Sequence, residues 1–298
     1  MSAFREESSP APAGITGRTR LGGLIGCPTA HSISPMMHND SFRALGLDMV
    51  YLCFDVLSEQ LGTVIPALRQ MKVYGFNVTM PDKEAILPWL DELAPEAELI
   101  GAVNTVRECE GKLIGHNTDG TGFMRAAREE GVDIAGKEMI LLGAGGAASA
   151  IAVQAALDGA KALHLVCRRS KSWQHARDLA DRISAKTNCK ADLTDLADTE
   201  EIRRLAKDSR LLVNATPVGM EPDTEKTPIG DASVFHPGLS VADIIYHPRQ
   251  TLLLKMAAEA GCHTFNGMYM LLWQGAEAFR LWTGQEMPAE LIRARYFS

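Results

Sequence analysis

Two serines near the N-terminus have the spacing of an anion-binding pair. Ser32 and Ser34 are two positions apart in an extended stretch, so their hydroxyls point the same way. They precede a predicted helix with Ser34 as its N-cap and Pro35 as its first residue, and the N-terminus of a helix attracts anions. The simpler interpretation is one N-cap serine and one loop serine. Taken alone, the pair favours that structural role.

Charged and amide side chains that could act on a bound substrate occur further along the chain. Lys83 follows a strand–turn–proline segment and Asp119 opens a predicted helix, where solvation and capping are their ordinary roles. Asn104 interrupts an apolar run, and Gln274 shares a helix face with leucines and alanines. Both amides need hydrogen-bond partners if they are buried, but backbone groups would suffice. Tyr246, at the end of a predicted strand, could simply pack.

A glycine turn in the middle of the chain predicts dinucleotide binding. Gly143, Gly145 and Ala148 fit the fingerprint G-x-G-x-x-G/A. The first glycine allows a tight turn, the second lets the backbone approach a pyrophosphate, and the small third residue lets helix and strand pack closely. A buried strand precedes the turn at Met139–Leu142, and a second strand follows at Ala162–Cys167. Although many glycine turns only join a strand to a helix, this order of elements favours a nucleotide site.

Composition limits the classes of protein to which the chain can belong. Its 298 residues are enough for two domains, and 46% hydrophobic with 22% charged residues is ordinary for a globular protein. A net charge of −7 argues against a nucleic-acid surface. The uncharged run Met139–Leu157 is mostly Gly and Ala and contains Gln154, so we predict no membrane span.

The cysteines and the N-terminal segment predict a cytoplasmic protein. The six cysteines are scattered, without the spacing of a metal site or a disulfide framework, so we expect free thiols and no metal. The segment Met1–Gly14 has no apolar core, and we expect a disordered tail rather than a signal peptide or an anchor.

Strands and helices alternate almost throughout, which predicts an α/β fold with parallel sheets covered by helices. The expected strands are 21–25, 49–54, 73–78, 100–106 paired with 112–115, 139–142, 162–167, 211–213 and 239–245. The expected helices are 35–45, 57–71 (interrupted or begun at Pro66), 83–92, 119–130, 146–159, 173–185, 199–208, 250–260 and 268–282.

Seven sequence blocks in a fixed order give the chain a family resemblance from about Leu21 to Trp282. They are GCPTAHSISPMMHN (26–39), NVTMPDK (77–83), GAVNTV (101–106), GHNTDGTG (115–122), GAGGAA (143–148), NATPVGM (214–220) and GMYMLLWQGAEAF (267–279). Together these blocks resemble the shikimate/quinate dehydrogenase family, and the later ones look closest to its dual quinate/shikimate branch.

The resemblance implies two α/β domains with the substrate cleft between them. Residues 21–120 would form a substrate-binding domain completed by a C-terminal helix, 267–298, and residues 121–266 would form a Rossmann-like dinucleotide-binding domain. Residues 1–20 would be the disordered tail.

The resemblance also implies roles for the polar residues. The ring carboxylate would rest on Ser32 and Ser34, and Lys83 with Asp119 would form the catalytic pair that exchanges the hydroxyl proton as hydride moves. The ring hydroxyls would contact Thr79, Asn104, Tyr246 and Gln274. The cofactor would contact Gly143, Ala144, Gly145, Gly146, Ala147, Arg168, Arg169, Thr216, Gly267 and Met270.

Three departures from the family pattern bear on cofactor and substrate. Arg168 and Arg169 follow the second strand of the nucleotide domain, where an acid would hold the ribose diol of NAD, so we expect NADP in preference to NAD. Ser170 stands where the dual branch has an Asp. Near the nicotinamide, Asn266 and Tyr269 replace an Asp and a Gly, and Tyr269 could crowd the ring or change the ring acid accepted.

The sequence therefore predicts a cytoplasmic NAD(P)-dependent dehydrogenase that interconverts shikimate or quinate with 3-dehydroshikimate or 3-dehydroquinate. The alternatives are a dehydrogenase of a related ring acid, such as an amino-shikimate, and a non-catalytic sensor of ring acid and nucleotide. We expect a small-molecule substrate, with no nucleic acid or membrane as partner. The sequence does not decide whether shikimate or quinate is the preferred substrate, in which direction the reaction runs physiologically, or whether the protein is a monomer or a homodimer.

Overall fold

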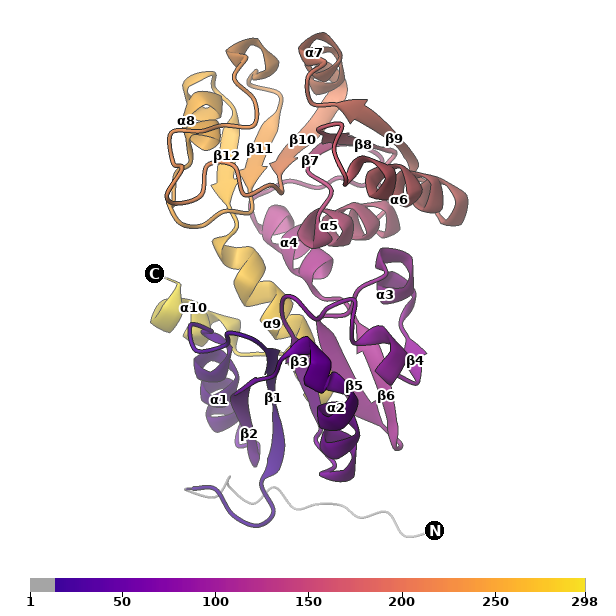
Figure 1. Ribbon diagram of the computed structural model, residues 1–298. Coiled ribbons are helices and arrows are strands. Elements are labelled where there is room, and N and C mark those ends of the chain that lie inside the picture. The colour runs from indigo at the N-terminus through magenta and orange to yellow at the C-terminus, as the bar shows by residue number, and fades with distance from the viewer. Residues whose placement is uncertain (1–13, 298) are drawn as a thin grey trace. The chain divides into compact units, whose positions relative to one another are not determined.

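The computed structural model describes residues 14–297, and the chain divides into two compact units (Figure 1). One unit holds residues up to 92 with 103–115 and 278 onward, and the other holds 93–102 with 116–277. The sequence analysis placed the domain boundaries at 120/121 and 266/267. The compact units of the structure change at 115/116 and 277/278. The expected tail falls mainly on residues 1–13, outside the described residues, and the first strand begins at Arg20.

The first unit is built on a six-stranded mixed sheet with the strand order β2-β1-β3-β5-β6-β4. The strand β1 pairs in parallel with β2 and β3, and β3 pairs antiparallel with β5. The strands are β1 (Arg20–Gly26), β2 (Met49–Asp55), β3 (Gly75–Val78), β4 (Glu92–Leu93), β5 (Thr105–Cys109) and β6 (Lys112–His116). The helices are α1 (Ser34–Leu45), α2 (Leu61–Gln70) and the C-terminal α10 (Ala289–Tyr296).

An aromatic cluster around His38 forms part of the core of the first unit. The His38 ring stacks on Tyr51 with 4.6 Å between centroids and lies 5.1 Å from the ring of Trp282. Complete burial lowers the pKa of His38 to about 3, so the imidazole is neutral here. The Trp282 indole donates to the Val106 carbonyl at 3.0 Å. A Cβ at Gly75 would lie 2.4 Å from the Trp282 nitrogen, so only glycine fits there.

A buried carboxylate ties α10 to α1. Asp40, on α1, accepts hydrogen bonds from Arg43, Arg295 and the Tyr296 hydroxyl, the last at 2.6 Å. Burial alone would raise the pKa of Asp40, but these donors together lower it. The C-terminal helix expected over 267–298 is interrupted, and its last part forms the separate short helix α10, which this long-range contact holds.

The second unit is a Rossmann-type domain. Its six strands are all parallel, in the order β12-β11-β10-β7-β8-β9. If the strands β7 to β12 are numbered 1 to 6 and the sheet is followed from β9 to β12, the order is 3-2-1-4-5-6, that of the doubly wound Rossmann fold. The strands are β7 (Glu138–Leu142), β8 (Ala162–Cys167), β9 (Lys190–Asp195), β10 (Ser209–Asn214), β11 (Ser240–Asp243) and β12 (His263–Asn266). The helices are α3 (Pro95–Ile100), α4 (Asp119–Glu129), α5 (Gly146–Leu157), α6 (Trp173–Lys186), α7 (Thr199–Asp208), α8 (Leu252–Glu259) and α9 (Met268–Thr283), whose residues from 278 onward belong to the first unit.

Both faces of this second sheet carry a core, as a parallel sheet requires. Met139 and Leu141 on β7 pack into one core with α5, whereas Ile140 and Leu142 pack into the other. Small residues on α5 allow close packing: a Cβ at Gly120 on α4 would lie 2.2 Å from the Ala150 carbonyl oxygen. The predicted α/β architecture with a Rossmann-like domain is confirmed.

Several predicted elements differ from the structure. Residues 83–92, expected to be helical, form turns, a 3-10 turn at Leu87–Trp89 that contains Pro88, and the start of β4. Ile100 ends helix α3 instead of beginning a strand. Residues 58–60 form a separate 3-10 turn, and α2 continues through Pro66. The strands β4, β9 and β12 and the helix α3 were not predicted, and the C-terminal helix expected over 267–298 forms two helices, α9 and α10.

Within the described residues, no helix is long and apolar enough to cross a membrane. The six cysteines are free thiols. The same part of the chain contains no group of three or more His, Cys, Asp or Glu side chains placed to hold a metal ion.

Candidate active site

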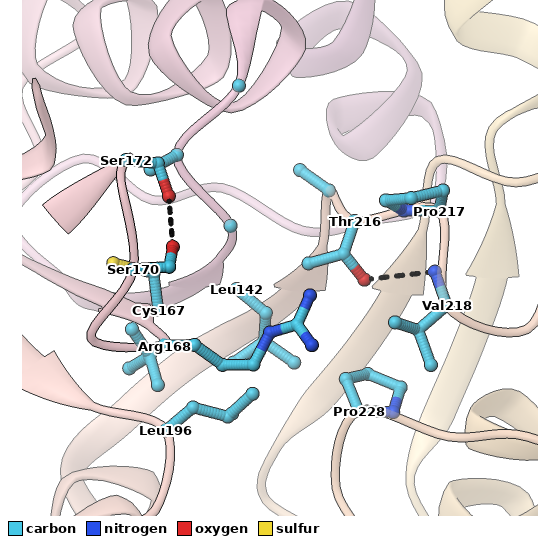
Figure 2. Close-up of a pocket in the computed structure, with 15 residues that line it drawn as sticks. Leu142, Cys167, Arg168, Ser170, Ser172, Leu196, Thr216, Pro217, Val218 and Pro228 are labelled. Carbon is cyan, nitrogen blue, oxygen red and sulfur yellow. Dashed lines mark hydrogen bonds between the residues drawn. The ribbon is translucent and has the colours of Figure 1, made fainter.

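A pocket of about 190 Å³ lies at the carboxyl ends of β7, β8 and β10 in the second unit (Figure 2). This is the point where the strand order reverses, because β8 follows β7 on one side and β10 pairs with it on the other. Ligands of doubly wound sheets bind at this switch point. The pocket is lined by Leu142, Gly143, Ala144, Gly145, Val166, Cys167, Arg168, Ser170, Ser172, Leu196, Ala215, Thr216, Pro217, Val218 and Pro228.

The glycine turn after β7 is shaped as the fingerprint predicts. Gly143 has φ +113°, and a Cβ there would lie 3.0 Å from the Ala215 carbonyl oxygen. A Cβ at Gly145 would meet nothing within 4 Å, so the backbone faces open space. Helix α5 begins at Gly146, directly after this space, and its free N–H groups and dipole favour an anion. Ala148 is fully buried, which lets α5 pack closely.

The two arginines after β8 have different surroundings. Arg168 lines the pocket, and Figure 2 shows its guanidinium extended towards the centre, near Thr216. Arg169 does not line the pocket: its Nε donates to Asp195 Oδ2 at 2.7 Å, and its guanidinium lies 4.8 Å from the Trp173 ring centre. The hydrogen bond from the Ala197 backbone N–H and the pairing with Arg169 lower the pKa of Asp195. Arg168 is thus the cation that faces the pocket.

The pocket lining favours a phosphorylated ligand over a free ribose diol. Among the fifteen lining residues there is one arginine and no aspartate or glutamate. Ser170 and Ser172 add hydroxyls 3.1 Å apart next to Arg168. Five of the predicted cofactor residues line the pocket: Gly143, Ala144, Gly145, Arg168 and Thr216. The other five lie outside its lining: Gly146, Ala147, Arg169, Gly267 and Met270.

In the first unit, Ser32 precedes helix α1 and Ser34 is the first residue of that helix. The Ser32 hydroxyl accepts the Ser34 backbone N–H at 3.2 Å, and both residues are half-buried. The prediction that Ser34 is the N-cap was wrong: Ile33 is the N-cap, no side chain caps the helix, and Ser34 is its first residue. Burial raises the pKa of the nearby Tyr51 phenol, and the Ser34 hydroxyl offsets part of that rise.

Three more predicted residues, two for substrate binding and one for catalysis, share this edge of the first sheet. Thr79 directly follows β3 and donates its backbone N–H to Ile25, at the end of β1, at 3.0 Å. Lys83 lies in the next turn, and its carbonyl accepts the Val103 N–H at 2.8 Å. Asn104 precedes β5, the antiparallel neighbour of β3. The ends of β1 and β3 and the start of β5 therefore bring Ser32, Ser34, Thr79, Lys83 and Asn104 to one edge.

Tyr51 and Asn77 join this group, although the sequence analysis did not select them. The Tyr51 hydroxyl donates to Asn77 Oδ1 at 2.7 Å, and Asn77 Nδ2 donates to the Asn104 carbonyl at 3.1 Å. Tyr51 is fully buried, which raises its pKa well above the usual value. The signal in the sequence was a polar residue inside each apolar strand, but the pairing between strands is not visible there.

The remaining predicted residues belong to the second unit. Asp119 is the first residue of α4, and its N–H bonds to Asn117 Oδ1 at 3.2 Å. One turn later, a Cβ at Gly122 would lie 2.5 Å from the Gln274 backbone nitrogen, so α4 and α9 nearly touch near both residues. Gln274 donates to the Leu271 carbonyl at 3.0 Å. Tyr246 is 40% exposed beyond the end of β11.

The region expected at the nicotinamide end is tightly packed. A Cβ at Gly267 would lie 2.0 Å from the Ile244 carbonyl oxygen, so no larger residue fits there without movement. Asn266 ends β12, and it donates to the Arg249 carbonyl at 2.9 Å and accepts the Met268 N–H at 3.1 Å. Asn266 therefore holds the start of α9, and Tyr269 lies in the first turn of that helix.

The strand order, the glycine turn and the pocket at the switch point define a dinucleotide-binding protein of the Rossmann type with a second α/β unit. Comparisons with known proteins narrow this class. Residues 24–106 match the family described as "Shikimate dehydrogenase substrate binding domain", and residues 267–295 match "Shikimate 5'-dehydrogenase C-terminal domain".

Relatives match almost the full length of the chain. The "Shikimate dehydrogenase (NADP(+))" of Listeria innocua is 49% identical over 283 residues, which is 95% of this chain and 97% of the relative. The crystal structure of shikimate 5-dehydrogenase from Listeria monocytogenes, in complex with shikimate and NAD, is 49% identical, with a TM-score of 0.92 over 94% of this chain and 97% of that one. Quinate dehydrogenase from Corynebacterium glutamicum, in complex with NAD, is 33% identical, with a TM-score of 0.81 over 94% and 99%. This chain belongs to the shikimate dehydrogenase family.

Proposed function

We propose that the protein is an NADP-dependent shikimate dehydrogenase that reversibly oxidises one ring hydroxyl of shikimate to the ketone of 3-dehydroshikimate. Quinate and 3-dehydroquinate form the second substrate pair. The observation that carries the cofactor assignment is the Arg168 pocket at the switch point of the Rossmann sheet. The assignment of the ring acid rests on the relatives, which are shikimate and quinate dehydrogenases.

The described residues fit a dinucleotide. The open space at Gly145 and the start of α5 suit a pyrophosphate, and Arg168 suits the additional phosphate of NADP. We assign cofactor contacts to the predicted set from Gly143 to Ala147, to Arg168 and Thr216, and to Gly267 and Met270 beyond the pocket. When bound, the nicotinamide accepts or returns the hydride.

The ring acid would lie on the edge of the first sheet. Ser32 and Ser34 would hold its carboxylate, because both hydroxyls lie at the N-terminal end of α1, where a negative charge is favoured. Its hydroxyls would bond to Thr79, Asn104, Tyr246 and Gln274. In this assignment residues 21–120 with 267–298 bind the ring acid, and residues 121–266 bind the nucleotide.

Lys83 and Asp119 would handle the proton of the reacting hydroxyl. As the C–H bond breaks and hydride leaves with its electron pair, Lys83 Nζ takes the hydroxyl proton and the C=O bond forms; in reduction the same group returns it. Asp119 would orient the hydroxyl. This division of roles is general acid–base catalysis by a positioned side chain.

Turnover with a small panel of substrates tests the function. Purified protein should reduce NADP+ with shikimate, more slowly with quinate, and with a lower kcat/KM for NAD+. Turnover of an amino-shikimate in place of both would instead favour the related-ring-acid alternative, which Tyr269 motivates. Binding of nucleotide and ring acid without any turnover would favour a sensor. A homodimer and a cytoplasmic location belong to the proposal as well, and sedimentation velocity tests the first.

The two arginines give a matched pair of variants for cofactor choice. We predict that Arg168→Ala raises KM for NADP about tenfold or more, since charge-assisted bonds to a phosphate contribute roughly 1.5–3 kcal/mol. KM for NAD should change little. Arg169→Ala is the control, because its guanidinium is engaged with Asp195 outside the pocket. Equal losses for NADP and NAD in Arg168→Ala would show that this arginine holds a part common to both cofactors.

A further inference from the structure

Asp243 is a buried carboxylate to which the proposed reaction gives no role. It ends β11 and is fully buried. Both of its oxygens accept Asn214 Nδ2, each at 3.1 Å. Oδ1 also accepts the Ile245 N–H at 3.0 Å, and Oδ2 accepts the Thr251 hydroxyl at 2.8 Å. Burying a carboxylate is costly unless its oxygens are bonded in this way.

Asn214 connects this carboxylate to the wall of the nucleotide pocket. Its Oδ1 accepts both the N–H of Thr216 at 3.0 Å and the Thr216 hydroxyl at 2.7 Å. Its Nδ2, besides bonding Asp243, donates to the Val218 carbonyl at 3.2 Å. Thr216 Oγ1 in turn accepts the Val218 N–H at 3.2 Å (Figure 2). Thr216 and Val218 both line the pocket, so one amide sets the shape of its wall.

The direction of the Asn214 amide is decided by Asp243. An ionised carboxylate only accepts hydrogen bonds, so it forces the NH2 of Asn214 to face residue 243 and the oxygen to face Thr216. With the opposite amide orientation, an NH2 would face the Thr216 N–H, and two donors would meet. Burial raises the pKa of Asp243 to about 6, so the group is still mainly ionised at neutral pH.

The same carboxylate fixes a second segment close to the glycine at the start of α9. By accepting the Ile245 N–H, it holds residues 244–246, and the Ile244 N–H also bonds the Asn214 carbonyl at 3.0 Å. Gly267 packs directly on Ile244, where a Cβ would lie 2.0 Å from the carbonyl oxygen. Asp243 therefore holds both the pocket wall and the segment against Gly267.

We propose that Asp243 and Asn214 are positioning residues for the dinucleotide: the carboxylate orients the amide, and the amide holds the Thr216–Val218 wall in its binding shape. The inference rests on the proposed NADP function. The proposed role accounts for the side-chain hydrogen bonds between Asn214 and Asp243. The sheet does not need these bonds, because β10 and β11 already pair through their backbones over four residues.

Fluorescence titration of the purified full-length protein with NADPH tests the proposal. Asp243→Asn keeps the size of the side chain but offers an NH2, so the amide of residue 214 is no longer oriented. We expect the Kd for NADPH to rise about tenfold, while kcat at saturating NADP and shikimate stays within about threefold of the original. The matched control is Thr251→Val, which removes another hydrogen bond from the same carboxylate on the α8 side. It should lower the melting temperature but leave the Kd for NADPH within about twofold.

A second variant keeps the proposal testable if Asp243→Asn does not fold. Asn214→Ala removes the connecting amide and should weaken NADPH binding to a similar extent, and the double variant should lose less than the sum of the two. Binding by Asn214→Ala or by folded Asp243→Asn that equals the unmodified protein overturns the inference. Failure of the unmodified protein to bind NADPH would instead refute the proposed function itself.

Discussion

Lys83 is the residue whose loss should stop the proposed proton transfer. It lies in the turn after β3, beside the segment that carries Asn104. We predict that Lys83→Ala lowers kcat by about 10²–10⁴-fold, the usual contribution of a general acid–base group, while KM for shikimate changes much less. Steady-state kinetics with shikimate and NADP measure both values, and circular dichroism with thermal unfolding shows that the variant is folded.

Lys83→Arg is the matched control for this prediction. Arginine keeps the positive charge but does not give up its proton in proteins, so this variant should be nearly as slow as Lys83→Ala. A Lys83→Arg enzyme with almost full kcat would show that position 83 supplies only a charge. Full kcat in Lys83→Ala would remove the catalytic assignment altogether.

At the scale of residues, the sequence identified side-chain types better than side-chain surroundings. Gly143, Gly145 and Arg168 were predicted for the nucleotide site, and all three line the pocket. Arg169 was predicted with the same role, but Asp195 engages it instead. The difference depends on β9, a strand 21 or more residues further along the chain, and adjacent arginines look alike until that strand is placed.

At the scale of elements, His164 links three neighbouring strands of the second sheet. It lies on β8 directly opposite Asp192 on β9, with Nδ1 2.9 Å from Asp192 Oδ2 and Nε2 3.5 Å from Glu138 Oε2 on β7. Burial opposes the charged imidazole, but the hydrogen bonds and charges of Asp192 and Glu138 outweigh it and raise the pKa of His164. The charged form is thus favoured by folding.

This raised pKa predicts how the stability of the domain depends on pH. A histidine whose pKa is higher in the folded state than in the unfolded state stabilises the folded protein. This contribution is fully present at pH values below the ordinary pKa of 6.5, and it is lost as the pH rises through the pKa of the folded state. We predict that Asp192→Asn reduces the fall in unfolding free energy between pH 6 and pH 8.5 by roughly 0.2–1 kcal/mol. Urea denaturation at the two pH values measures it.

The control for this prediction removes a carboxylate that no histidine faces. Asp223 pairs with Lys226 on the surface at 2.9 Å, so Asp223→Asn should leave the pH dependence as in the unmodified protein. An unchanged pH dependence in Asp192→Asn would show that Asp192 does not favour the charged form of His164.

Elements with strong local patterns were predictable, and those fixed by distant contacts were not. The strand over 162–167 and the helix over 199–208 have the predicted bounds, because continuous apolar residues and a clear amphipathic pattern define them locally. The edge strand β9, KADLTD, is largely polar and is held by pairing with β8. Residues 83–92 have a helical composition, but Pro88 and the pairing of β4 in the sheet prevent a continuous helix.

At the scale of the whole molecule, each unit has a sheet and a core of its own, so each can respond to its own ligand. The second unit carries the pocket at the ends of β7, β8 and β10. The first carries the serines, Thr79 and Lys83 at the ends of β1 and β3. A ligand that binds only the folded state stabilises what it contacts, by about 2.7 kcal/mol at a hundredfold excess over Kd.

This division predicts a separate hydrogen-exchange footprint for each ligand. Exchange reports local opening, and opening becomes rarer where a ligand holds the backbone. NADP alone should slow amide exchange in segments 142–146, 166–172 and 215–218, which surround the pocket. Shikimate alone should slow exchange around 32–34, 79–83 and 104.

NAD at the same concentration should protect segment 166–172 less than NADP does, because NAD lacks the additional phosphate that Arg168 would bind. Exchange measured by mass spectrometry on the full-length protein resolves these segments. Protection of segments 32–34 and 79–83 by NADP alone, with none at 142–146, would contradict the assignment of the nucleotide to the Rossmann sheet.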